Sequence, residues 1–158
     1  MIRKHRPGTL APRQRRDALT RSQMMSRIRS TDTRPELRVR SAVYQLGVRY
    51  RIHVSPLPGK PDLANVRRKW AVFVHGCFWH SHAGCKLASD PKSRREYWVP
   101  KLRRNAERDE QKIDQLHRLG YRVMVIWECE TRDPAALAVR IQEFFGRRTS
   151  SESAGRGS

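Results

Sequence analysis

The stretch WAVFVHG at residues 70–76 decides the fold. It is apolar at successive positions, so it predicts a strand that is buried on both faces of a sheet. The run PDLANV at 61–66 precedes it, and the basic turn VRRK between them predicts a hairpin. A second apolar run, YRVMVIWE at 121–128, predicts another buried strand. A sheet with such strands needs helices on both of its faces.

Three helical patterns supply that cover. Thr33 and Glu36 form a capping-box pattern with a proline between them, and the apolar spacing that follows predicts a helix ending at Gly47. A long amphipathic pattern predicts a second helix over residues 97–119. A third helix is expected from Pro134, with the preceding aspartate as its cap.

The remaining segments complete the domain plan. Residues 20–29 predict a short helix, and residues 48–53 alternate between apolar and polar side chains as a half-buried strand does. The sequence therefore predicts an α/β sandwich with a mixed central β-sheet flanked by helices. We expect this domain to span residues 20–145, between a basic, disordered extension at 1–19 and a disordered polar tail at 146–158.

The composition points to a polyanionic partner. The 158 residues include 34 Lys and Arg against 15 Asp and Glu, which gives a formal net charge of +19. Cationic proteins gain affinity for nucleic acids through counterion release. The chain has no long apolar run and no apolar segment behind its basic N-terminus, so we expect a cytoplasmic protein without a membrane span. Three cysteines without an export signal favour metal binding or burial over disulfides.

A cluster of metal-binding residue types follows the strand at 70–76. Cys77, His82 and Cys85 lie close together in one loop, and Cys129 follows the other buried strand. Neighbouring strands that end at one sheet edge would bring these four residues together as a structural zinc site of three sulfurs and one nitrogen. The alternative is a set of buried thiols beside a solvated histidine.

A second polar group lies in the same region. His80 should face away from His82 in an extended loop, which places it with His75 near the start of the opposite strand, at Asp62. A carboxylate that binds Mg²⁺ and a neutral imidazole that takes a proton from water form a phosphodiester-cleaving pair. Asp62 is explained equally well as a turn residue after proline.

Two further acids allow both a functional and a structural interpretation. Glu36 fits its capping position without any other role, although a carboxylate there could also hold a metal-bound water. Asp109 lies on the polar side of the long predicted helix. It could orient a histidine, or it could form a surface ion pair with the neighbouring arginines.

Large apolar side chains stand where no core pattern requires them. Phe78 and Trp79 lie in the polar loop, and Trp98 lies among lysines and arginines near the start of the long helix. Rings interleaved with cations can stack on bases or enter a base step. Phe78 and Trp79 could instead fold over the metal cluster as a small core. Met25 could likewise be a wedge or the inner side of the short helix.

The sequence resembles the very short patch repair endonucleases, bacterial enzymes that nick DNA beside a T:G mismatch left by deamination of 5-methylcytosine. Five stretches between residues 20 and 145 carry the resemblance: TRSQMMSRIRSTDTRPE (20–36), LPGKPD (57–62), VFVHGCFWH (72–80), RRNAERD (103–109) and VIWEC (125–129). The resemblance implies a restriction-endonuclease-like fold, in agreement with the sandwich expected above. It also departs from restriction enzymes, because Phe73-Val74-His75 stands where they carry Glu-x-Lys.

The resemblance implies a role for each matching residue. Asp62 would be the principal Mg²⁺ ligand, joined by the main-chain carbonyl of Val74, and His80 would be the general base. Glu36 and His75 would hold metal-bound waters. Asp109 matches an acid close to the catalytic histidine. The zinc ligands would be Cys77, His82, Cys85 and Cys129. Phe78, Trp79 and Trp98 would form a wedge that enters the DNA from the major groove, and Met25 would enter from the minor groove.

These roles predict a Mg²⁺-dependent, strand-specific endonuclease with one structural Zn²⁺ and one or two Mg²⁺ ions. It would act as a monomer in the bacterial nucleoid on double-stranded DNA containing a T:G mismatch, and would cut 5′ to the thymine. Mismatch-repair proteins, a repair polymerase and a cognate cytosine-5 methyltransferase would be its functional partners. Two alternatives are a restriction-type endonuclease that cuts matched duplexes and a zinc-stabilised DNA-binding module without catalysis.

Overall fold

The computed structural model describes residues 31–88, 91 and 94–146. Its helices are α2 (Arg34–Gln45), α3 (Arg95–Arg118) and α4 (Pro134–Gly146). Its strands are β1 (Arg51–Ile52), β2 (Leu63–Asn65), β3 (Trp70–His75) and β4 (Arg122–Trp127). Two short 3₁₀ helices, η1 (Lys86–Ala88) and η2 (Glu128–Arg132), follow the loop after β3 and the end of β4.

The four strands form one mixed sheet in the order β1-β2-β3-β4. β2 pairs antiparallel with both β1 and β3, whereas β3 and β4 are parallel. The last pair in the parallel register joins His75 to Trp127, so β3 and β4 end at the same edge of the sheet. The mixed central sheet is confirmed.

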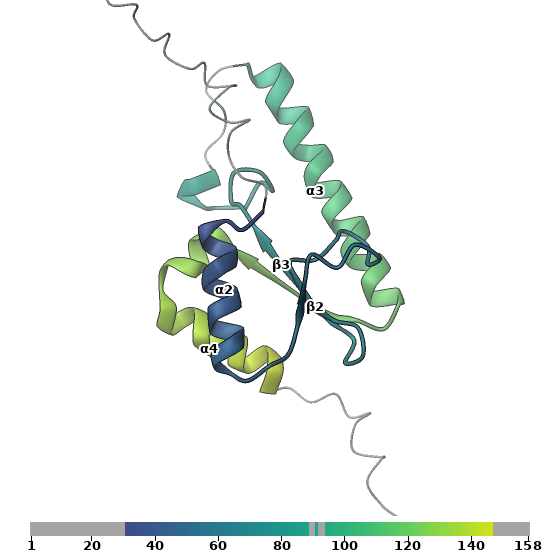
Figure 1. Cartoon of the computed structure of the whole chain (residues 1–158). Coiled ribbons are helices and arrows are strands. Elements are labelled where there is room, and N and C mark those ends of the chain that lie inside the picture. Colours follow the sequence, from purple (N-terminus) through teal and green to yellow (C-terminus); the bar gives the residue numbers. More distant parts are fainter. Residues whose placement is uncertain (1–30, 89–90, 92–93, 147–158) are drawn as a thin grey trace, which may run out of the picture. The chain divides into compact units, whose positions relative to one another are not determined.

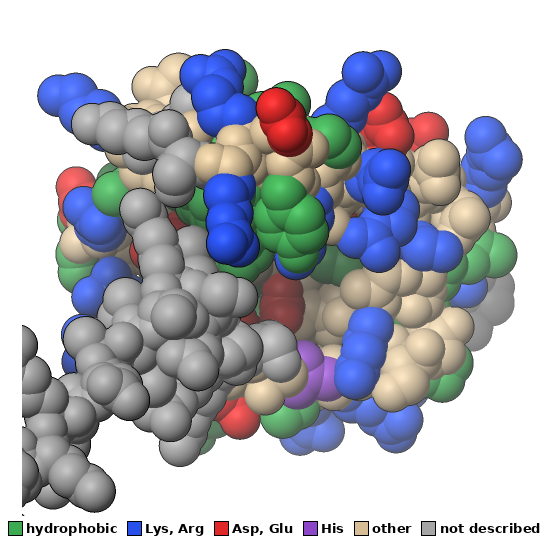
Figure 2. Space-filling view, turned by 90° about the horizontal axis from the view of Figure 1, so that it is seen from above, with side chains coloured by type: hydrophobic (Ala, Val, Ile, Leu, Met, Phe, Trp, Pro, Cys, Tyr) green, Lys and Arg blue, Asp and Glu red, His purple; other side chains and the backbone are tan. Residues whose placement is uncertain are grey.

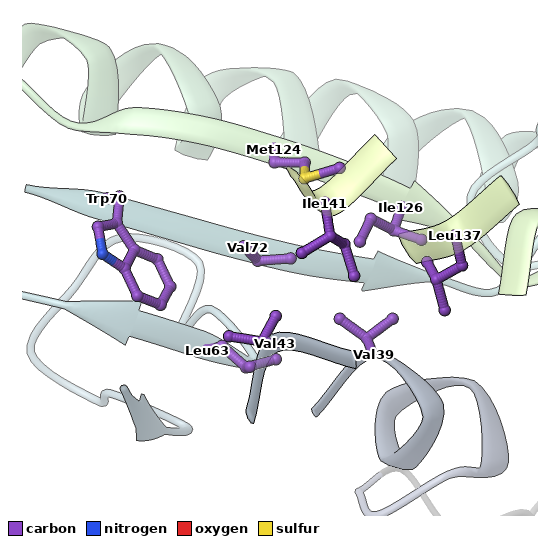
Figure 3. Packing of buried hydrophobic residues seen from close by; sticks show 9 residues of the cluster. All are labelled: Val39, Val43, Leu63, Trp70, Val72, Met124, Ile126, Leu137 and Ile141. Carbon is purple, nitrogen blue, oxygen red and sulfur yellow. The ribbon is translucent and has the colours of Figure 1, made fainter. Parts of the chain in front are cut away.

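Helices cover both faces of the sheet (Figure 1). On one face, α2 and α4 bury side chains against β2, β3 and β4, and Figure 3 shows these side chains meeting between the layers: Val39, Val43, Leu63, Trp70, Val72, Met124, Ile126, Leu137 and Ile141. On the other face lies the cluster Ala64, Ala71, Phe73, Leu116 and Tyr121, to which α3 contributes the leucine. Burying each large apolar side chain contributes about 1.5–3 kcal/mol, so the sheet is held from both sides.

The helix ends follow the expected caps. Thr33 Oγ1 accepts a hydrogen bond from Glu36 N at 3.4 Å, and its hydroxyl donates to Glu36 Oε1 at 2.8 Å. Gly47 adopts a positive φ of 67°, which glycine tolerates without strain, and the chain leaves α2 there. Asp133 Oδ1 accepts from the main-chain N–H of Ala135 at 2.9 Å and so caps α4.

The expected strand at 48–53 is wrong in its length, and one of its residues, Ile52, does not face the core as expected. Only Arg51–Ile52 pair with β2, and the Ile52 side chain is 48% exposed, although Val48 and Tyr50 pack against the core. β1 lies at the sheet edge, and the positive φ of 46° at His53 turns the chain away there. An edge strand with one partner has little to extend it.

Several expectations fall outside the described residues. These are the short helix at 20–29 with Met25, the basic extension at 1–19, and all of the polar tail at 146–158 except its first residue. Among the described residues, no helix is long and apolar enough to cross a membrane.

Candidate functional site

The shared edge of β3 and β4 gathers the side chains predicted to be functional. The chain leaves β3 at His75 and enters the loop that contains the histidines and two of the cysteines, while β4 leads directly into η2 and the third cysteine. Parallel pairing therefore brings two segments about fifty residues apart in the sequence to one place.

The first group at this edge consists of three thiols and one imidazole. His82 Nδ1 lies 3.4 Å from Cys129 Sγ and 3.6 Å from Cys77 Sγ. Cys85 completes the group, and the four ligand atoms all lie within 4.8 Å of one another. Three sulfurs and one imidazole nitrogen at this spacing match the donor set of a tetrahedral zinc site. The predicted convergence of these four residues is confirmed, and the identity of their metal stays a prediction.

The thiols have different electrostatic surroundings. Burial raises the pKa of Cys77 to about 12. The main-chain N–H of Leu87 lowers the pKa of the half-buried Cys85 thiol. A cation bound between them would favour both thiolates and would offset the effect of burial on Cys77.

The second group contains two histidines and an aspartate. The imidazole of His80 is hydrogen-bonded through Nδ1 to the Asp109 carboxylate, and its ring stacks on that of His75 with centroids 4.0 Å apart and an interplanar angle of 8°. Burial, with a smaller effect of His80, lowers the pKa of His75 to about 4. A carboxylate that accepts the Nδ1 proton leaves Nε2 as the basic nitrogen of His80. The orienting interpretation of Asp109 is therefore favoured over a surface ion pair.

Asp62 lies immediately before β2 and is held by β3. Its Oδ2 accepts a hydrogen bond from Val74 N at 2.7 Å. Because the N–H and C=O of one strand residue point to the same side, the Val74 carbonyl also points toward this side of β3. Burial raises the pKa of Asp62 to about 6, and the nearby Glu36 adds to the rise. The Asp62 carboxylate and the Val74 carbonyl therefore lie on the same side of β3, as two ligands of one ion would. Their roles as Mg²⁺ ligands stay predictions.

A third polar group surrounds the Arg40 guanidinium on α2. Its Nη1 contacts Asp32 at 2.6 Å, and its Nη2 lies 3.1 Å from Glu36 Oε2 and 3.0 Å from His53 Nε2. A guanidinium only donates hydrogen bonds, so His53 Nε2 is the acceptor in this contact. Asp32, Glu36 and His53 are grouped closely enough to hold a cation, and the permanently charged Arg40 guanidinium occupies that position.

The capping interpretation of Glu36 is confirmed by its bonds to Thr33 and to the main chain at Asp32. Its role with a metal-bound water stays a prediction. Arg40 and His53 were not identified from the sequence. The spacing of Glu36 and Arg40 by four residues is typical of a helical ion pair and was the available signal for Arg40.

The aromatic residues of the loop meet a residue of α3. Phe78, Trp79 and Trp98 form a triangle of edge-to-face contacts with centroid distances of 5.3–5.9 Å. Lys101 Nζ lies 5.2 Å from the centroid of the Trp98 ring. These half-buried rings pack on one another beside a cation, which fits both base stacking and a small core, so their contact with DNA stays a prediction.

Basic side chains gather on one face of the molecule. Figure 2 shows Lys and Arg side chains around a hollow in which acidic and histidine side chains are visible. A depression of this kind, acidic at its base and cationic at its rim, can attract a phosphate backbone and still offer oxygen ligands to a cation.

Comparisons with known proteins identify the family of the chain. Residues 15–86 match the family model described as DNA mismatch endonuclease Vsr. The Type II nicking enzyme V.XorIIP of Xanthomonas oryzae pv. oryzae is 45% identical over 125 residues, covering 79% of this chain and 91% of the relative. The DNA mismatch endonuclease Vsr of Escherichia coli is 38% identical over 134 residues, covering 82% of this chain and 85% of the relative. The chain belongs to the Vsr family.

Membership of the Vsr family relates the described architecture to a known fold and a known class of enzyme. The family implies a restriction-endonuclease-like fold, which agrees with the mixed sheet between helices. It makes the protein a nuclease of the DNA mismatch endonuclease class, for which a divalent metal is expected. This class excludes the alternative of a DNA-binding module without catalysis.

Proposed function

We propose that the protein nicks one strand of double-stranded DNA 5′ to the thymine of a T:G mismatch, by Mg²⁺-dependent hydrolysis. The observation that carries this proposal is the His80–Asp109 hydrogen bond at the sheet edge. It supplies an oriented imidazole base in the loop that follows β3, the strand that holds Asp62. Family membership supplies the mismatch and the nicking chemistry.

His80 acts as the general base. Asp109 holds the Nδ1 proton and stabilises the imidazolium that forms, so Nε2 takes the proton of the attacking water. His75 is buried against the other face of the ring and stays neutral, because its pKa lies near 4. Because His75 is neutral, it does not repel the positive charge that His80 gains when it takes the proton.

Asp62 and the Val74 carbonyl would hold the catalytic ion. When bound, Mg²⁺ polarises the scissile phosphate and offsets the charge that develops on it. Oxygen ligands from one carboxylate and one carbonyl suit a cation that keeps several waters. Glu36, which lies near enough to affect the pKa of Asp62, would hold one of these waters.

Cys77, His82, Cys85 and Cys129 would form the structural metal site. They tie the loop after β3 to η2, the segment after β4. When bound, Zn²⁺ crosslinks these two segments and stabilises the folded loop. The loop can then present His80 and the aromatic residues in a fixed arrangement.

Phe78, Trp79 and Trp98 would enter the duplex beside the mismatch from the major groove. A T:G step is easier to unstack than a matched step, so insertion costs less there. The net charge of +19 supports backbone binding independent of sequence. Met25, proposed as the wedge from the minor groove, lies outside the described residues.

The nick would carry a 5′-phosphate suitable for repair synthesis. We therefore include a repair polymerase, mismatch-repair proteins and a cognate cytosine-5 methyltransferase among its functional partners in the nucleoid. We propose that the nuclease itself acts as a monomer.

A strand-resolved nicking assay tests the function. End-labelled duplexes with a T:G mismatch, a matched C:G pair or a matched T:A pair are incubated with Mg²⁺ or with EDTA. We expect cuts in the thymine strand of the mismatched duplex alone, and only with Mg²⁺. Equal cutting of matched duplexes would support the restriction-type alternative.

Variants make the assay specific to the site. Asp62→Ala should abolish nicking and leave binding of the mismatched duplex in place. The matched control is Asp114→Ala, which removes an exposed carboxylate on α3 and should nick normally. Normal nicking by Asp62→Ala would refute the proposed ligand.

A further inference from the structure

Four rings connect the cysteine cluster to the catalytic histidine. The His82 ring stacks on Trp127, with centroids 4.1 Å apart and an interplanar angle of 4°. Trp127 meets His75 edge to face at 5.4 Å and 76°. His75 stacks in turn on His80, at 4.0 Å and 8°. The indole of Trp127 contacts both His82, in the cysteine cluster, and His75, which stacks on the catalytic His80.

The backbone fixes the position of Trp127 independently of its ring. Its residue pairs with His75 at the end of the parallel register, and its N–H donates to Glu130 Oε2 at 2.7 Å. On the other side, the positive φ of 54° at Ser81 reverses the chain between His80 and His82. The two histidines therefore face different partners, and the rings of His75 and Trp127 form the connection between them.

Trp127 is not explained as an ordinary core residue. Neither of the two apolar clusters that hold the helices to the sheet includes it. Trp70, at the opposite end of β3, is by contrast 4% exposed and packs edge to face on Phe145 of α4 at 4.9 Å. An indole placed among imidazoles can restrict their ring rotations through its flat faces and edges.

We propose that Trp127 is a positioning residue that transmits the order of the cysteine–histidine cluster to His80. This inference rests on the proposed function of His80 as base. With Trp127 in place, His75 is held between the indole and the His80 ring, so the His80 ring keeps the orientation in which Asp109 accepts its Nδ1 proton. Partners behind metal ligands and catalytic groups have comparable orienting roles.

The test compares Trp127→Leu and Trp127→Phe with the matched control Trp70→Phe. Each full-length protein is measured for zinc content, for single-turnover nicking of a T:G duplex, and for the side-chain NMR resonances of its histidines. We expect Trp127→Leu to lower the maximal rate by about 10–100-fold, as loss of an outer partner does. The DNA concentration at half-maximal rate should stay within about twofold of the wild type, since the indole is assigned no DNA contact.

Two further results separate positioning from general destabilisation. Trp127→Phe should recover most of the rate, because a phenyl ring can still stack. Trp127→Met, which has no ring, takes the place of the leucine variant if that variant fails to fold. Trp70→Phe should lower thermal stability without moving the resonances of His75 and His80. Trp127→Leu should shift those resonances.

The proposal would be overturned by a folded Trp127→Leu or Trp127→Met with a wild-type maximal rate and unchanged His75 and His80 resonances. If the wild-type protein did not nick the T:G duplex at all, the proposed function would fail instead. The NMR comparison would then still decide whether Trp127 positions the His80 ring.

Discussion

Asp62→Asn should make the protein more stable while it abolishes nicking. The Asp62 carboxylate is mostly buried, and burial raises its pKa from 3.8 to about 6. The folded protein therefore holds the proton more tightly than the unfolded chain does. Asparagine keeps an oxygen that can accept the hydrogen bond from Val74 N and removes the charge that burial disfavours.

The magnitude follows from the shift. A change of about 2 pKa units at about 1.4 kcal/mol per unit corresponds to roughly 3 kcal/mol of stability. Because the folded pKa is the higher one, wild-type stability falls as the pH rises from about 4 through 6. The net rise already includes the opposing effect of the Val74 hydrogen bond, which lowers the pKa. We therefore expect Asp62→Asn to gain roughly 3 kcal/mol at pH 7.5 and little at pH 4.

Urea denaturation at pH 7.5 and pH 4, without Mg²⁺, measures this gain. The control Asp114→Asn changes an exposed carboxylate and should alter neither stability nor nicking. The reasoning is refuted if Asp62→Asn is less stable than the wild type at pH 7.5, or if its advantage is the same at both pH values. Either result would show that the folded protein favours the ionised carboxylate even without a cation.

Three other changes test the remaining polar groups. Asp109→Asn should slow nicking by about 10²–10⁴-fold in a single-turnover assay with DNA affinity unchanged; a normal rate would contradict its orienting role. Arg40→Met should cost about 3 kcal/mol in urea denaturation, because it leaves buried Glu36 unpaired. The control Arg103→Met breaks an exposed pair and should cost under about 1 kcal/mol; equal losses would refute the burial argument. Cys129→Ser should reduce bound zinc, measured by elemental analysis, and lower the melting temperature; full zinc content would exclude it as a ligand.

The fold could be predicted because its signals are local. Strand runs that are apolar on both faces, a capping box at Thr33 and an aspartate cap at Asp133 each act over a few residues. β1 was less predictable, since its length depends on pairing at the sheet edge and on the turn at His53. Alternation in sequence does not determine how far an edge strand pairs.

The site could be predicted where topology alone determines proximity. Two adjacent strands that end together were enough to bring Cys129 to Cys77. His80 and His82 do face different partners, but a turn with a positive φ of 54° at Ser81 separates them, not alternation in an extended loop. The bonds of Arg40 to Asp32 and His53 join three different segments through long side chains. Such contacts depend on rotamers and on the exact loop path, for which the sequence has no periodic signal.

The register between β3 and β4 connects the two halves of the site. His75 and Trp127 are paired, so their side chains project to the same face, and Cys129 follows by two residues. A slip of one residue would turn Trp127 to the opposite face. It would remove the indole from His82 and from His75 in one step, while Asp62 would remain bonded to Val74 on the other side of β3. The base and its metal cluster therefore depend on the parallel pairing, whereas the proposed Mg²⁺ ligands depend on the antiparallel hairpin.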